Sequence, residues 1–130
     1  MDRIIDANFN RAKEGLRVCE DVCRFILDDK TLTRQFKTVR HQLTESILGL
    51  GLKSLVKSRN IEQDVGKASQ LTELKRKNVA DIFYANIQRV KESIRVLEEF
   101  AKLRKTKVAL DLKKFRYQVY ALEKKVAARF

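Results

Sequence analysis

Two segments of the chain carry the same set of polar side chains with chemistry to offer. The set is an asparagine, an arginine and a glutamate three positions apart, and it occurs as Asn8, Arg11, Glu14 and, seventy-eight positions later, as Asn86, Arg89, Glu92. The planar guanidinium fork can hold two oxygens of one phosphate group. Carboxylate and amide oxygens suit a divalent cation or a polar substrate. The repeated set therefore points to binding of phosphorylated small molecules.

Each set lies in a segment that the sequence predicts to be one long helix. The segments are Arg3 to Phe25 and its copy Asp81 to Leu103. In both, apolar residues recur at alternating spacings of four and three, which places them on one helix face. The two predicted core stripes are Ile5, Phe9, Ala12, Leu16, Cys19, Cys23, Ile26 and Phe83, Ile87, Val90, Ile94, Leu97, Ala101.

A neighbouring stripe on each helix is mainly apolar but is interrupted by the polar set. The interruption is an amide and a guanidinium one turn before a very small residue: Asn8, Arg11, Gly15 in one copy and Asn86, Arg89, Ser93 in the other. A buried polar group costs about 1–3 kcal/mol unless it is paired. These groups therefore need partners, either in the protein or in a bound ligand.

The duplication continues beyond the first helix of each copy. The segment Phe36 to Leu43 matches Leu112 to Val119 at an offset of seventy-six. The repeated unit is thus a helical hairpin, and two copies are predicted to close a four-helix bundle with a long central loop. We expect a single all-α domain with repeat one at 3–51, a connecting loop at 52–71 and repeat two at 72–130.

Helix ends and the other two core faces follow from the same patterns. Asp2 and Thr72 are candidate N-caps of the first and third helices, and the fourth helix is expected from about Val108. The predicted core positions of the second and fourth helices are Leu32, Phe36, Val39, Leu43, Ile47, Leu50, Leu112, Phe115, Val119, Leu122 and Val126.

Composition limits the class of protein and of partner. The 130 residues are 44% hydrophobic and 35% charged, with no proline and two cysteines, which fits a globular helical domain. Without a run of eighteen apolar residues or a signal-peptide pattern, we expect a soluble, cytoplasmic protein that does not enter a membrane. The net charge of +12 indicates anionic partners. Composition alone does not choose between nucleic acid and phosphorylated small molecules, although no nucleic-acid-binding motif is present.

Further candidate residues lie outside the repeated set. Arg40 and Arg59 are additional cations for phosphate, His41 is a candidate substrate ligand and Asp64 a candidate metal ligand. The loop at 52–70 has no counterpart in the duplication. A duplicated protein that handles two different ligands must differentiate its halves, which favours functional roles for loop residues.

The alternative interpretation is that these polar residues satisfy one another. Ion pairs at i and i+3 would join Arg11 to Glu14 and Arg89 to Glu92. The two asparagines would bond each other across a pseudo-twofold axis, and His41 would be an ordinary hydrogen-bonded side chain. The sequence leaves both interpretations open.

Blocks along the whole chain resemble a known family. They are RIIDANFNRAKEGLRVCEDVCRF, LTRQFKTVRHQL, SRNIEQDVG, ANIQRVKESIRVLEEFAKL and FRYQVYALEK. In combination they are similar to the small hydroxymethylpyrimidine-phosphate kinases of thiamine biosynthesis, which occur alone or fused ahead of thiamine-phosphate synthase. The resemblance implies transfer of the γ-phosphoryl group of ATP, with Mg²⁺, to the phosphate of hydroxymethylpyrimidine phosphate, and no activity on the free alcohol. Because the acceptor is already an oxyanion, this chemistry needs clustered cations rather than a strong general base.

Physical reading and resemblance together give a hypothesis for the site. The predicted catalytic residues are Arg11, Arg89 and Arg40, the substrate-binding residues Asn8, Asn86, Arg59 and His41, and the metal ligands Asp64, Glu14 and Glu92. Two other functions stay open: a non-catalytic helical module that docks onto thiamine-phosphate synthase, and a basic bundle that binds nucleic acid. A homo-oligomer is also left open.

Overall fold

Five α-helices form the fold in the computed structural model, which describes residues 1–68 and 75–130. They are α1 (Asp2–Phe25), α2 (Lys30–Leu48), α3 (Leu52–Lys57), α4 (Val79–Ala101) and α5 (Thr106–Ala127). Those two ranges contain no strand, so the predicted all-α class is confirmed. Within them, no helix combines the length and apolar character needed to span a membrane.

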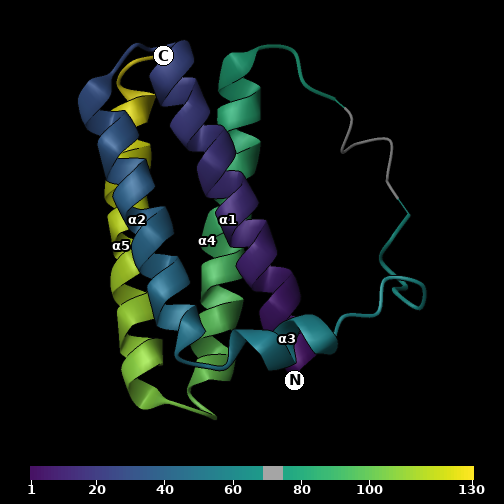
Figure 1. Ribbon diagram of the computed structural model, residues 1–130. Coiled ribbons are helices and arrows are strands. Elements are labelled where there is room, and N and C mark those ends of the chain that lie inside the picture. Colours follow the sequence, from purple (N-terminus) through teal and green to yellow (C-terminus); the bar gives the residue numbers. More distant parts are fainter. Residues whose placement is uncertain (69–74) are drawn as a thin grey trace.

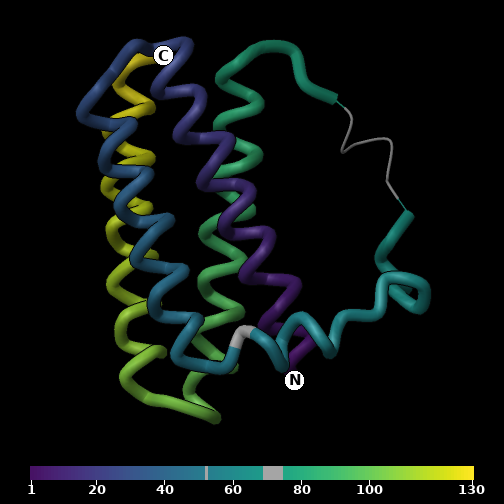
Figure 2. The backbone as a smooth tube through the Cα atoms, in the orientation of Figure 1, coloured from purple at the N-terminus to yellow at the C-terminus, as the bar shows by residue number. Residues whose placement is uncertain are grey.

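The four long helices lie side by side around one apolar core (Figure 1). α1 packs against α2 and α4, and α5 packs against α4 and α2, so the four helices close a ring. The turn between α1 and α2 lies at one end of the ring and the turn between α4 and α5 at the other, as the backbone tube shows (Figure 2). As a result α1 and α4 run antiparallel along their shared interface, which is the most extensive of those between the described helices.

The core is built from the predicted apolar stripes. All the predicted positions of α4 and all those of α5 are buried, as are those of α1 within the helix and those of α2 from Leu32 to Ile47. Leu50 is only partly buried, and Ile26 is 56% exposed, so its placement in the core is wrong. The reason is local: α1 ends at Phe25, and Asp28 then takes a left-handed backbone conformation with φ of 49° that turns the chain toward α2.

Side-chain caps fix two of the helix starts. Asp29 accepts a hydrogen bond from the Leu32 amide at 2.9 Å and caps α2. Asn78 accepts from the Asp81 amide at 2.8 Å and caps α4. The sequence predicted Asp2 as the N-cap of α1, and this is wrong, because Asp2 is the first residue of the helix itself. The other predicted cap, Thr72, lies outside the described residues.

The chain between the hairpins begins with the short helix α3. Gly51, at φ of 89°, makes the sharp turn out of α2 that few other residues adopt. Leu55 is fully buried and fastens α3 to the core beside α1. The residues that follow α3 are therefore delivered to the N-terminal end of α1 (Figure 1).

Candidate functional site

A cavity of about 540 Å³ lies between α1 and α4 and gathers the repeated polar set. Both copies contribute equivalent residues, and the lining consists of Asn8, Arg11, Glu14, Gly15, Asn86, Arg89, Glu92, Ser93 and Val96. The structure thus brings together, from two helices, six of the predicted site residues.

The two small residues allow α1 and α4 to approach closely at this point. A Cβ atom on Gly15 would stand 2.7 Å from Cγ2 of Val90 and 2.9 Å from the carbonyl oxygen of Asn86. Ser93, the repeat equivalent of Gly15, is itself buried. Close packing here sets the polar side chains of both helices around one space.

The two arginines of the cavity are uncommitted. Neither Arg11 nor Arg89 forms an ion pair or a hydrogen bond with any residue of the described ranges, although each has a glutamate three positions ahead. Glu92 instead accepts a hydrogen bond from Gln88 at 2.8 Å. The structure therefore does not form the i, i+3 pairs that were the alternative interpretation. Two guanidinium groups remain free to meet anionic oxygens.

The two asparagines repeat each other's geometry and are not hydrogen-bonded to each other. The Asn8 amide nitrogen donates to the Ile4 carbonyl at 2.9 Å, and that of Asn86 donates to the Ile82 carbonyl at 2.8 Å. Each side chain is thus held by its own helix, so the bond predicted between the two as an alternative is absent. The amide oxygen of each is left as an acceptor for a ligand.

A second cavity, the loop-side cavity, has a volume of about 690 Å³ and adjoins the first. Asn8, Arg11 and Glu14 line both cavities. The remaining walls of the loop-side cavity come from the start of α1 and from the segment after α3: Met1, Arg3, Ile4, Asp6, Ala7, Asn10, Arg59, Asn60, Ile61 and Asp64.

Two contacts fasten the segment after α3 to α1. Arg59 forms a bidentate ion pair with Asp6, with Nε–Oδ2 and Nη2–Oδ1 distances of 2.7 Å. The hydrogen bonds and charge of Asp6 raise the pKa of Arg59 above its ordinary value. Arg3 donates from Nη2 to the Asn60 carbonyl at 3.1 Å. Arg59 therefore reaches the site as predicted, but its guanidinium is already engaged by a carboxylate.

Arg40 and His41 line neither cavity. The Nε of Arg40 lies 2.9 Å from Oε2 of Glu20, which is only 3% exposed. A buried carboxylate is costly without a cation beside it, and Arg40 supplies that cation. The other half repeats the arrangement, with Arg116 3.0 Å from Glu98. The grouping of Arg40 with Arg11 and Arg89 thus needs correction: Arg40 belongs to the ion pairs that join the helices of a hairpin.

The three predicted metal ligands are divided between the cavities. Glu92 lines the α1/α4 cavity, Asp64 lines the loop-side cavity, and Glu14 lines both. Asp64 also accepts a hydrogen bond from the Gly66 amide at 3.0 Å. Across residues 1–68 and 75–130, no three His, Cys, Asp or Glu side chains gather closely enough to hold a metal ion by themselves. The carboxylates present fit a cation that arrives already bound to phosphate oxygens.

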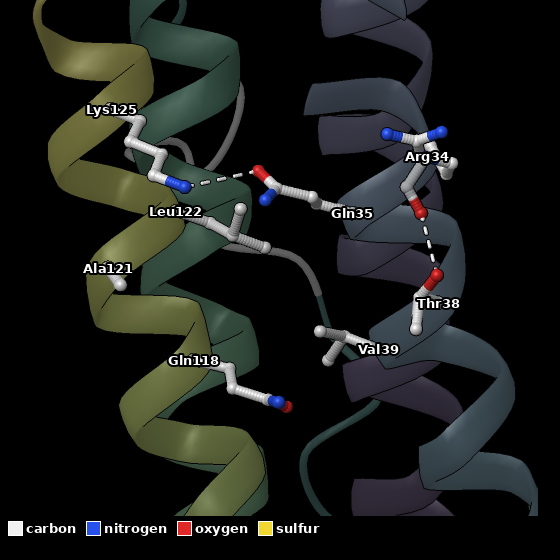
Figure 3. A pocket seen from close by; sticks show the side chains of 8 residues that line it. All are labelled: Arg34, Gln35, Thr38, Val39, Gln118, Ala121, Leu122 and Lys125. Atoms are coloured by element: carbon white, nitrogen blue, oxygen red, sulfur yellow. Dashed lines mark hydrogen bonds between the residues drawn. The ribbon is translucent and has the colours of Figure 1, made fainter. Parts of the chain in front are cut away.

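Another groove, of about 400 Å³, lies between α2 and α5 and is drawn in Figure 3. Its two cations, Arg34 and Lys125, come from different helices, and Lys125 already donates to Gln35 at 3.3 Å. Gln118 extends into the groove with its buried amide oxygen unpaired among the described residues. Without clustered free cations or carboxylates, this groove is poorly suited to phosphate chemistry.

Comparison with known proteins assigns the chain to a family. Residues 3–125 match the ThiD2 family. The chain belongs to the ThiD2 family. The matched range includes both copies of the polar set and the Arg59 segment. Every residue that lines either cavity, except Met1, therefore lies within the range that matches the family. No solved structure matches this ThiD2 chain.

Its curated relatives are longer proteins. The chain is 43% identical over 124 residues to a protein of Synechocystis named thiamine-phosphate synthase, covering 93% of this chain and 34% of that protein. It is 39% identical over 120 residues to the protein of that name from Rhodopirellula baltica, covering 92% and 32%. A Thermosynechococcus vestitus protein with the same name is 40% identical over 122 residues, covering 93% and 34%. The chain therefore spans about a third of the length of these relatives.

Proposed function

We propose that this ThiD2 chain acts in thiamine biosynthesis by transferring the γ-phosphoryl group of ATP to the phosphate of hydroxymethylpyrimidine monophosphate. The observation that carries the proposal is the α1/α4 cavity, which places the uncommitted Arg11 and Arg89 on one space. We infer that two copies of a helical hairpin close a four-helix bundle in order to face these equivalent residues across a pseudo-twofold axis.

The reaction makes modest demands on acid–base chemistry. A phosphate oxygen of the acceptor forms a new bond to the γ-phosphorus, and the bond from that phosphorus to the bridging oxygen of ADP breaks. The products are ADP and hydroxymethylpyrimidine diphosphate. Two fully ionised reactants give two fully ionised products of the same total charge, so no proton has to be removed. The main obstacle is repulsion between two anions.

The cavity residues address this obstacle directly. Arg11 and Arg89 neutralise and orient phosphate oxygens, each from its own half of the molecule. Glu14 and Glu92 provide carboxylate oxygens for Mg²⁺ that enters with ATP, while the asparagine amide oxygens accept from the pyrimidine or from metal-bound water. Mg²⁺, when bound, neutralises phosphate charge.

The proposal is tested by ADP release from ATP and Mg²⁺ with three acceptors. Hydroxymethylpyrimidine monophosphate is expected to support turnover, and the free alcohol and water are not. Phosphorus NMR of the products distinguishes the diphosphate from simple ATP hydrolysis. Absence of diphosphate at any enzyme concentration contradicts the proposal.

A second function has its own support. All three relatives described above are named thiamine-phosphate synthase, and this chain matches only a third of each. The comparisons favour a module tied to that enzyme more directly than they favour a kinase. A non-catalytic docking module would co-purify with thiamine-phosphate synthase and release no ADP, whereas a kinase that also docks would co-purify with it and release ADP.

A further inference from the structure

The two cavities meet along a single wall on α1. Asn8, Arg11 and Glu14 are the residues that both linings share. A ligand in one cavity and a ligand in the other would therefore come closest at this wall. A group that passes between two ligands requires such a meeting point, with a cation beside it.

Outside the shared wall, the two ends of the α1/α4 interface differ. Asp6 holds Arg59 and so brings the segment after α3 against α1. Its repeat equivalent on α4 is Tyr84, which has no carboxylate to form such an ion pair. The Tyr84 ring instead packs against Phe83 and Phe130, with centroid separations of 5.6 and 6.1 Å. Among the described residues of the connecting segment, those that line a cavity lie at the repeat-one end.

The loop-side cavity has the composition expected for a nucleoside. Ile4 and Ile61 provide exposed apolar surface for the faces of a flat base. The Asn60 amide is paired with Gln63. The Asn10 amide nitrogen donates to Asp6, so the Asn10 amide oxygen is the acceptor left for the polar edge of the base. Arg3 adds a further cation at the rim. This cavity, at about 690 Å³, is also larger than the α1/α4 cavity at about 540 Å³. The larger space, with Ile4 and Ile61 in its lining, suits the larger of the two proposed ligands.

We propose that the loop-side cavity binds the nucleotide and that the α1/α4 cavity binds the phosphorylated pyrimidine. The base lies between Ile4 and Ile61, and the phosphates run toward Arg11, where the γ-phosphoryl group meets its acceptor. This assignment rests on the proposed function and names which half of a duplicated protein holds ATP. The Asp6–Arg59 pair is the positioning contact that gives only repeat one a nucleotide site.

Matched variants test the assignment through binding rather than turnover. Ile4 and its repeat equivalent Ile82 are 39% and 37% exposed, but only Ile4 lines the loop-side cavity. Ile4→Ser is therefore compared with Ile82→Ser. In the connecting segment, Ile61→Asp is compared with Val65→Asp, because Val65 is fully exposed and lines neither cavity.

The probe is a non-hydrolysable ATP analogue with Mg²⁺, titrated by calorimetry into each full-length variant. Ile4→Ser and Ile61→Asp are expected to raise its Kd about tenfold, because each removes apolar surface from the base. Ile82→Ser and Val65→Asp leave the Kd within about twofold, and all four variants bind the pyrimidine monophosphate like the original protein. Inorganic tripolyphosphate, which lacks a base, is expected to bind all variants except Ile61→Asp equally, because only that change places a negative charge in the lining of the cavity.

Different failures have different meanings. If Ile82→Ser weakens the analogue as much as Ile4→Ser, or if neither Ile4→Ser nor Ile61→Asp weakens it, the assignment is overturned even when ADP release continues. If the expected pattern is found but no diphosphate forms, the nucleotide assignment stands and the kinase function fails. If the original protein binds neither the analogue nor the monophosphate, both are overturned.

Discussion

Gly15 of α1 lies directly against the backbone of Asn86 in α4, so closely that a Cβ atom would stand 2.9 Å from the Asn86 carbonyl oxygen. The same atom would stand 2.7 Å from Cγ2 of Val90. Asn86 lines the α1/α4 cavity. The close approach of the two helices and the spacing of the cavity walls therefore depend on position 15 being a glycine, which has no side chain.

Gly15→Ala is expected to destabilise the protein by about 1–3 kcal/mol, the usual cost of overpacking a tight contact. The α4 backbone has to move, since a carbonyl oxygen has no rotamer to change. Urea unfolding followed by circular dichroism measures the effect. Gly66→Ala is the control, because the nearest atom to its Cβ would be Asp64 Oδ1 at 3.5 Å, an ordinary contact. Equal midpoints for the two variants would contradict this packing.

Arg40→Gln is expected to reduce stability by about 2–3 kcal/mol, somewhat less than for a fully buried pair, because Arg40 is partly exposed. Glu20 would be left buried with only the longer contact to Arg17, at 3.4 Å. Turnover per folded molecule should stay within about twofold of the original, since Arg40 lines neither cavity. Unfolding and ADP-release measurements on the same preparation separate the two effects. Normal stability with lost turnover would return Arg40 to the site.

Both cysteines give stability a pH dependence. Burial, aided by the charge of Asp29, raises the pKa of Cys23 to about 11, and burial raises the pKa of Cys19 as well. An unfolded thiol has a pKa of about 8.5. Above that pH the unfolded chain loses a proton that the folded protein keeps, so stability is complete below about pH 8.5 and falls as the pH rises toward 11.

Cys23→Ala tests this dependence. Between about pH 9 and about pH 10.5, the original protein should lose about 1.4 kcal/mol per pH unit more than the variant, which is the contribution of one thiol. Denaturant unfolding at four pH values gives both slopes, and differences in packing cancel because they do not change with pH. Parallel slopes would show that the Cys23 thiol titrates normally in the fold.

Asp6→Asn is expected to loosen the segment after α3. Without the carboxylate, Arg59 loses a bidentate ion pair and the segment keeps only the Arg3–Asn60 contact named above. Hydrogen exchange of the amides at 59–64 should accelerate about tenfold or more, while exchange in α4 stays unchanged. Asp111→Asn on α5 removes the same charge without touching the segment. Unchanged exchange at 59–64 would mean that Asp6 does not hold the segment.

The sequence repeat was sufficient to predict the four long helices and the gathering of the polar set, but not α3, which lies in the predicted connecting loop. Identical spacing in two long helices gives their residues equivalent positions, so Asn8 and Arg11 had to meet Asn86 and Arg89 if the helices packed together. Helix periodicity likewise predicted most of the core, with Ile26 beyond the end of α1 and Leu50 beyond the end of α2 wrongly included. It missed four buried apolar positions: Val22, Leu55, Val108 and Ala109.

Contacts between distant, unrepeated positions could not be predicted in this way. Arg59 and Asp6 are fifty-three positions apart, and no periodicity links them. Arg40 looked like a free cation because no sequence pattern links it to Glu20, and only the packing of α1 on α2 shows that this carboxylate is buried beside it. Asn10 and Ile61 were missed for the same reason. The one available signal was that Asn10 lies one turn before Glu14.

The central claim is that Arg11 and Arg89 together hold the reacting phosphates, and the most direct test is single-turnover diphosphate formation by the Arg11→Gln/Arg89→Gln double variant. Its control is Lys37→Gln/Lys113→Gln, which removes the same two positive charges from repeat-equivalent positions that line neither cavity. We predict that the arginine pair lowers the rate by about a thousandfold or more, in line with loss of transition-state charge stabilisation, and that the lysine pair changes it by less than about threefold. Equal rates for the two folded double variants would contradict the account.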